Sequence, residues 1–93
     1  HNTRGTGLAS AWAAVQAGVN RLYSSVGGLG GCPFAPGASG NIATEDLVYL
    51  LRDSGIGVDV DLTAAITAAG VAQRLIGHDL PSALLRAGDR ILS

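Results

Sequence analysis

Three side chains of the sequence are of types that can carry out acid–base or metal chemistry, and two of them lie in a glycine-rich segment. His1 opens the chain, Cys32 is its one cysteine, and Asn41 closes the glycine-rich segment over residues 27–41. Imidazole nitrogen and amide oxygen can bind a divalent cation, and a thiol can transfer a proton. Each also has an ordinary alternative: a lone histidine is commonly solvated, a lone cysteine inert and buried, and an asparagine before a helix a cap.

The glycine-rich segment favours a functional loop. It holds six of the fourteen glycines and two of the three prolines, and glycine lets the backbone approach a ligand closely. A loop of this kind before a helix could cradle phosphate, but the segment matches neither the GxGxxG fingerprint nor the Walker-A pattern with its lysine. A nucleotide fold is therefore disfavoured. A surface loop without a role is also disfavoured, because Pro33 and Pro36 stiffen the segment.

A helix and a strand are expected before this loop. Leu8, Trp12 and Val15 recur every three or four residues, which predicts a helix over 7–17 that Gly18 ends. Trp12 is expected to pack between helices. Alternating side chains over 21–26 then predict a short strand.

Three helices are expected after the loop. Thr44 is the expected N-cap of a helix over 45–54, and the buried side of that helix is Leu47, Val48, Leu50 and Leu51. Asp61 caps a third helix that stops at Gly77, and Pro81 suits the first turn of a last one. His78, between these two helices, is expected to be solvated. One strand cannot build a sheet, so the pattern indicates part of a larger α/β fold.

Composition excludes several classes of function. The chain of 93 residues is 47% hydrophobic and 14% charged with a net charge of −1, and its six basic residues are scattered arginines. This argues against a nucleic-acid-binding surface. No apolar run approaches the roughly 18–20 residues that a membrane span needs. One cysteine makes no intramolecular disulfide, which fits the cytoplasm. The chain lacks methionine, so we expect it to be part of a longer protein.

The loop and its flanks resemble one known family. Residues 28–41 (GLGGCPFAPGASGN), followed by ATEDLV over 43–48, look like the signature loop and following helix of 3-hydroxy-3-methylglutaryl-CoA lyases. The opening residues HNTRG are similar to the second half of the family's His-x-His-[Asp/Asn]-Thr motif. Asn2 stands where aspartate is commoner, a variant associated with bacterial members. Tyr23 stands where the family usually has aspartate.

The resemblance implies a fold. It is the C-terminal portion of a (β/α)₈ TIM barrel, an α/β fold whose catalytic groups lie on loops at the C-terminal ends of the strands. Residues 1–58 would contain the end of strand 7, helix 7 (7–17), strand 8 (21–26), the catalytic glycine loop (27–41) and helix 8 (45–54). Residues 59–93 would be a C-terminal helical extension. Apolar side chains of the barrel part would be left exposed to face its remainder, namely Leu8, Leu22, Val26 and Leu47.

The resemblance also implies a chemistry. The family uses a divalent cation, Mg²⁺ or Mn²⁺, for which His1 and Asn41 match two ligands, and Cys32 matches the catalytic cysteine. The reaction would cleave a branched 3-hydroxyacyl-CoA by a retro-Claisen step, giving acetyl-CoA and acetoacetate from 3-hydroxy-3-methylglutaryl-CoA. The cation would act as Lewis acid and Cys32 as general acid. The loop residues assigned to the substrate side are Gly30, Gly31, Gly37, Ser39 and Gly40.

Alternatives stay open for the substrate and for activity itself. The acyl group could belong to another branched substrate such as citramalyl-CoA, and the chain could be a truncated, non-catalytic product that packs against other chains. The related isopropylmalate-type synthases are disfavoured, because the Gly-Gly-Cys-Pro sequence is a lyase feature. The expected partners are an acyl-CoA and the remainder of the barrel, with no nucleic acid and no membrane. The sequence leaves a homo-oligomer open.

Overall fold

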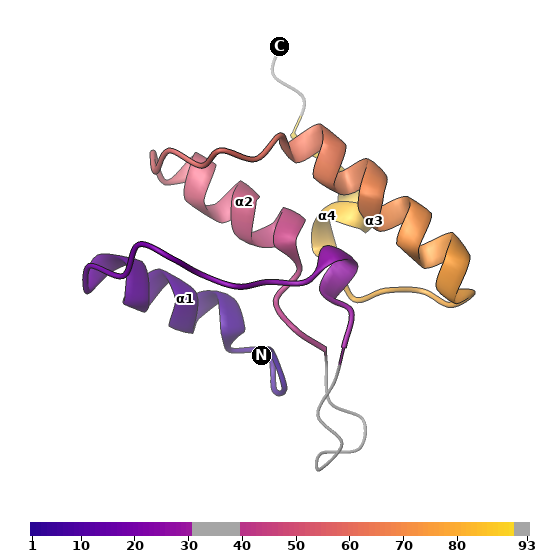
Figure 1. Ribbon diagram of the computed structural model, residues 1–93, viewed down its shortest axis with the longest axis horizontal. Coiled ribbons are helices and arrows are strands. Elements are labelled where there is room, and N and C mark those ends of the chain that lie inside the picture. The colour runs from indigo at the N-terminus through magenta and orange to yellow at the C-terminus, as the bar shows by residue number, and fades with distance from the viewer. Residues whose placement is uncertain (31–39, 91–93) are drawn as a thin grey trace.

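The computed structural model describes residues 1–30 and 40–90, which are mostly helical. Four α-helices follow one another, α1 (Gly7–Gln16), α2 (Thr44–Asp53), α3 (Leu62–Ile76) and α4 (Ala83–Ala87), and a short 3₁₀ turn, η1 (Val26–Gly28), lies between α1 and α2. Figure 1 shows α2 in the middle, with α1 on one side and the α3–α4 pair on the other. The extended segment over 19–25 runs along α1 towards η1 (Figure 1).

Apolar side chains cover α2 on both of these sides. Leu47 and Leu51 of α2 pack with Ala11 of α1 and with Ile42, and Trp12 packs against this cluster as expected from its helical spacing. On the other side, α2 contacts α3, α4 and η1, and the buried apolar side chains there include Leu62, Ala69, Leu80 and Leu84. Helix α2 is therefore the central element of the fold.

The expected helix ends are confirmed where the signal is local. The side chain of Asp61 accepts a hydrogen bond from Ala64 N at 3.1 Å and so caps α3. Gly18, Gly55 and Gly77 follow α1, α2 and α3 with φ of +100°, +81° and +84°. Glycine reaches this left-handed region without steric cost. These caps explain why the predicted helix bounds differ from the observed ones by only a residue or two.

Two expectations about local structure were wrong, and the strand expected over 21–26 is not confirmed. Within the described residues, Ser25 makes one isolated parallel bridge to Ala43, and η1 begins at Val26, the last residue of the expected strand. A ladder needs a neighbouring strand, which the described residues do not provide. Thr44 is the first residue of α2 rather than its cap, and Ser82, not Pro81, occupies the start of α4 as its N-cap.

Burial also departs from the sequence pattern at several apolar residues. Leu47, expected among the exposed side chains that face the remainder of a barrel, is 5% exposed and belongs to the core. Leu8 and Leu22 are half-buried against that core. Leu50 of α2 is only half-buried, and Leu75 of α3 is 82% exposed. Among the described residues, no helix is long and apolar enough to cross a membrane.

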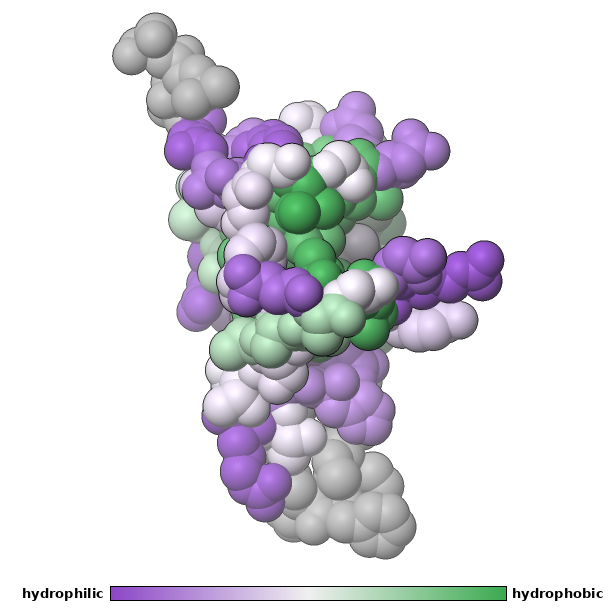
Figure 2. Space-filling model, turned by 90° about the vertical axis from the view of Figure 1, so that its left-hand side faces the viewer, coloured by the Kyte–Doolittle hydropathy of each residue, from purple (hydrophilic) through white to green (hydrophobic). Residues whose placement is uncertain are grey.

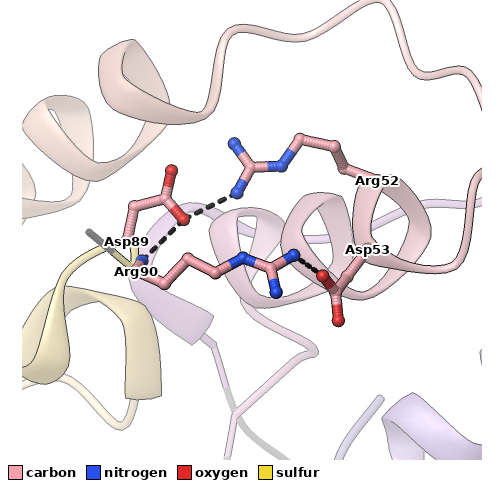
Figure 3. Close-up of polar contacts among 4 residues, drawn as sticks. All are labelled: Arg52, Asp53, Asp89 and Arg90. Atoms are coloured by element: carbon pink, nitrogen blue, oxygen red, sulfur yellow. Dashed lines mark hydrogen bonds and ion pairs between the residues drawn. The ribbon is translucent and has the colours of Figure 1, made fainter. Parts of the chain in front are cut away.

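Two ion pairs join the end of α2 to the residues after α4 (Figure 3). Arg52 Nη2 donates to Asp89 Oδ1 at 2.6 Å, and Arg90 pairs with Asp53. Both guanidinium groups also lie over the Tyr49 ring, at 5.6 and 5.8 Å from its centroid. The hydrogen bond from Arg52 lowers the pKa of Asp89, and the same bond raises the pKa of Arg52. These exposed contacts hold the residues after α4 against α2.

Candidate functional site

The two sides of the glycine-rich segment are joined by backbone hydrogen bonds. Ser25 N donates to Ile42 O at 2.9 Å, and Thr44 N donates back to Ser25 O at 2.9 Å. These bonds form the parallel bridge between Ser25 and Ala43. We call residues 25–30 and 40–45 the loop stem. The stem fixes where the segment leaves the fold and where it returns.

A tight turn forms the first half of the stem. Gly27 and Gly28 have φ of +65° and +79°, a region that side chains other than glycine rarely adopt. A Cβ atom on Gly27 would lie 2.4 Å from Leu80 Cδ1, and one on Gly28 would lie 3.2 Å from Asn41 O. The turn therefore needs glycine for its backbone conformation and for the close approach of Leu80.

Asn41 is held within the second half of the stem. Its Nδ2 donates to Leu29 O at 2.9 Å, and the half-buried side chain lies against Gly30, where a Cβ would come 2.6 Å from Nδ2. Gly40 is buried: a Cβ there would lie 2.0 Å from Gly28 O and 2.6 Å from Gly30 O. Because the amide nitrogen donates to Leu29, the oxygen Oδ1 is the atom of Asn41 that suits a hard cation.

His1 is brought to the same stem by its neighbour. Asn2 N donates to Gly40 O at 3.0 Å, and Asn2 Oδ1 accepts from Gly7 N at 2.8 Å, at the first residue of α1. His1 is the residue before Asn2, and Asn41 is the residue after Gly40. The two candidate ligands are therefore each next to a residue of this backbone hydrogen bond, although they are far apart in the sequence. The His1 residue is exposed.

Glu45 is a buried acidic residue. The sequence indicated only that it lies in the first turn of a helix. It is 0% exposed, and Gly27 N donates to both of its carboxylate oxygens at 3.1 Å. The sequence gave no signal of this burial, because Glu45 lies between the polar residues Thr44 and Asp46 and does not share the helical stripe of Leu47 and Leu51.

The remaining candidates lie outside the described residues. These are Cys32, Gly31, Gly37 and Ser39. Within residues 1–30 and 40–90, no three His, Cys, Asp or Glu side chains are grouped as metal ligands. The described part thus joins the neighbours of His1 and Asn41 by one backbone hydrogen bond and adds no third ligand of these types. His78 is exposed as expected, and its Nδ1 lies 3.0 Å from Asp79 O.

An open groove lies elsewhere on the molecule. Its volume is about 350 Å³, and Val19, Leu22, Ile56 and Val60 are among the residues that line it. Figure 2 shows apolar surface gathered on this side, between hydrophilic patches. Ser24 and Thr44 also line the groove, and their hydroxyl oxygens are 2.7 Å apart. Neither His1 nor Asn41 lines it, so the groove and the candidate metal ligands are separate features.

Comparisons with known proteins agree on a single family. The HMGL-like family model matches residues 1–71. The (R)-citramalyl-CoA lyase of Chloroflexus aurantiacus is 48% identical over 88 residues, which cover 95% of this chain and 28% of that enzyme. The hydroxymethylglutaryl-CoA lyase of Bacillus subtilis is 49% identical over 82 residues, covering 88% of this chain and 27% of the relative.

A solved structure is similar over the whole chain. It is an HMG-CoA lyase from Acinetobacter baumannii in complex with coenzyme A and 3-methylmalate, with a TM-score of 0.87 and 48% identity. The match covers 100% of this chain and 32% of that one. The chain therefore spans about a third or less of the length of the proteins it matches.

Proposed function

The chain belongs to the HMGL-like family, and from this premise we propose that it contributes to a carbon–carbon lyase. The proposed reaction cleaves 3-hydroxy-3-methylglutaryl-CoA to acetyl-CoA and acetoacetate. The observation that carries the proposal is the Asn2 N to Gly40 O hydrogen bond of 3.0 Å. It supports a joint role for His1 and Asn41, the two residues that match family ligands.

His1 and Asn41 would hold a divalent cation, Mg²⁺ or Mn²⁺, together with ligands from elsewhere in the enzyme. Imidazole nitrogen and amide oxygen are suitable donors for either ion. One feature of this chain favours the role: the Nδ2 bond to Leu29 O orients Oδ1 of Asn41. When bound, the cation supplies Lewis-acid stabilisation to the oxygen that gains charge during cleavage.

Cys32 would supply the proton in the second part of the reaction. Cleavage of the carbon–carbon bond leaves a thioester enolate, which becomes acetyl-CoA when its carbon gains a proton. A thiol is acidic enough to donate that proton, and an alcohol is far less so. Gly30, Gly31, Gly37, Ser39 and Gly40 would form the loop that faces the acyl-CoA.

The proposed setting is a (β/α)₈ barrel in which residues 1–58 form the last units and residues 59–93 a helical extension. The similarity to the HMG-CoA lyase structure over the whole chain supports this assignment. The extended backbone at Ser25 supports it too, because Ser25 lies near the end of the expected strand 8. We propose the bacterial cytoplasm as its location, which suits a chain with one cysteine.

A second substrate, (R)-citramalyl-CoA, is favoured by one observation. The chain is as similar to the citramalyl-CoA lyase as to the B. subtilis hydroxymethylglutaryl-CoA lyase, at 48% and 49% identity. Both reactions release acetyl-CoA and a 2- or 3-oxo acid through the same retro-Claisen step. Turnover of each thioester by the same enzyme preparation separates the two candidates, since the proposed assignment requires preference for the hydroxymethylglutaryl thioester.

The test of the metal ligands compares two pairs of variants in the enzyme that carries this sequence. We expect His1→Ala and Asn41→Ala each to raise the Mn²⁺ concentration for half-maximal activity at least about tenfold. His78→Ala and Asn20→Ala are the matched controls, because both residues are exposed and lie outside the stem. Parental metal dependence in both ligand variants contradicts the assignment.

The test of Cys32 separates a proton donor from a packing residue. Cys32→Ser should lower kcat by about 10²–10⁴-fold with little change in KM, because the hydroxyl is a weaker acid than the thiol. Substrate should also slow alkylation of the parental thiol. A serine variant with near-parental kcat rules out the acid role.

A further inference from the structure

The Glu45 carboxylate is used by no step of the proposed reaction, yet it is fully buried in the stem that carries Asn41. Its residue exposure is 0%, and the hydrogen bonds that the described residues make to it both come from Gly27 N, at 3.1 Å to each oxygen. Removing a carboxylate from water is unfavourable, and one amide donor compensates only part of the loss. An apolar side chain of similar size would fill the space without that loss, so packing alone does not explain the acid.

The position of Glu45 at the start of a helix also stabilises its negative charge. Glu45 lies in the first turn of α2, where the helix dipole favours a negative charge. The carboxylate therefore links two elements: it is stabilised by the start of α2, and it fixes the amide of a turn 18 residues earlier in the chain. That amide belongs to Gly27, whose φ of +65° begins the left-handed turn of the stem.

From Gly27, contacts continue to both candidate ligands. The turn through Gly28 sets the position of Leu29 O, which accepts from Asn41 Nδ2 at 2.9 Å. Gly40 packs against the carbonyl groups of Gly28 and Gly30, where no room is left for a Cβ, so its position follows that of the turn. Gly40 O in turn accepts from Asn2 N, the residue after His1. Each step from Glu45 to the two candidate ligands is thus a direct hydrogen bond, a close contact or a peptide unit.

We infer that Glu45 is a positioning residue, whose buried carboxylate fixes the Gly27–Gly28 turn and through it aligns Asn41 and His1 for a divalent cation. Its effect on the cation rests on the proposed function. Its effect on the turn does not, and can be measured without any activity.

The experiment compares two carboxylate-to-amide substitutions in the enzyme that carries this sequence. Glu45→Gln keeps the size of the side chain and removes its charge. Asp61→Asn is the matched control, because Asp61 also accepts one backbone N–H at a helix N-terminus, but that N–H is of Ala64 in α3 and not of the stem. The first readout is amide hydrogen exchange over residues 25–30, and the second is the Mn²⁺ concentration for half-maximal activity.

We expect Glu45→Gln to speed exchange over residues 25–30 and to raise the Mn²⁺ requirement by about tenfold, the lower end of the range for a direct partner of a metal ligand, because Glu45 acts on Asn41 only through the turn. Asp61→Asn should leave both readouts at the parental values. Glu45→Asp is the complementary variant and also serves if Glu45→Gln does not fold, because the charge stays while the shorter side chain moves the carboxylate away from Gly27 N.

Two results overturn the inference. One is parental exchange over residues 25–30 in both Glu45→Gln, which keeps an acceptor oxygen, and Glu45→Asp, which shortens the side chain; the carboxylate then does not hold the turn. The other is an equal change in both readouts for Asp61→Asn, which indicates a general loss of stability. If the parent enzyme shows no metal-dependent lyase activity, the proposed function fails while the exchange experiment still decides the role of Glu45 at the turn.

Discussion

Adding a single methyl group at Gly40 tests whether the loop stem is as tightly packed as the structure shows. A Cβ atom at this position would lie 2.0 Å from Gly28 O and 2.6 Å from Gly30 O. Both neighbours are backbone atoms and cannot rotate away, so the two halves of the stem must separate. Gly40 is not in the left-handed region, so the effect of Gly40→Ala is steric and not a matter of φ.

The magnitude follows from what the separation disrupts. Forcing an extra carbon into a packed site costs about 1–3 kcal/mol. The movement also strains the Asn41 Nδ2 to Leu29 O and Asn2 N to Gly40 O hydrogen bonds, each worth about 0.5–1.5 kcal/mol. We expect Gly40→Ala to lower the free energy of unfolding by about 2–4 kcal/mol. The Mn²⁺ requirement should rise as well, because Asn41 is the next residue.

Gly57→Ala is the matched control for this prediction. Nothing lies within 4 Å of a Cβ at Gly57, and its φ is not positive. The same substitution there should raise stability by about 0.4–1 kcal/mol, because alanine restricts the unfolded chain more than glycine does. Urea unfolding of both variants in the enzyme gives the comparison. Equal stabilities for the two alanine variants would refute the close approach of Gly40 to the Gly28 and Gly30 carbonyl groups.

Three further predictions concern the residues that support the stem and α4. Leu80 is 4% exposed and lies against Gly27, so Leu80→Ala should cost about 2–5 kcal/mol of unfolding free energy in a urea titration, and a loss below about 1 kcal/mol would contradict the contact. The Asp46 carboxylate accepts three hydrogen bonds at the start of α4. Asp46→Ala should lower the free energy of unfolding by about 1–3 kcal/mol, and unchanged hydrogen exchange of the α4 amides would argue against these bonds. The pKa of Asp89 is lowered by the Arg52 hydrogen bond, so this pair should stabilise the fold above the ordinary aspartate pKa and lose its effect as pH falls through the lowered pKa. Arg52→Gln should flatten that part of the stability-versus-pH curve, and high salt should do the same to the parent; an unchanged curve in the variant would show that the pair adds nothing.

Local sequence signals determined the helices of this protein. Asp61 and Gly77 bound α3 because a side-chain acceptor and a left-handed glycine act on amides and carbonyls within one turn. The period of Leu8, Trp12 and Val15 placed α1 because side chains three or four residues apart share a face. Such signals depend only on near neighbours, so the sequence contains them in readable form. The glycine-rich loop likewise indicated the family from its residue types and their order alone, and the match of the HMGL-like family model to residues 1–71 confirms it.

The arrangement of the site was decided by the tertiary structure. Asp46 caps a helix 37 residues away, Glu45 holds an amide 18 residues earlier, and Asn2 meets Gly40. Ser25 forms a single bridge among the described residues, because the strand predicted over 21–26 was expected to pair with parts of a barrel outside this chain. Helical spacing did not predict the burial of Glu45 either, since η1, α3 and α4 cover a side of α2 that its own apolar stripe does not mark. Contacts of this kind form only when distant segments meet, and their geometry depends on the packing of the whole chain.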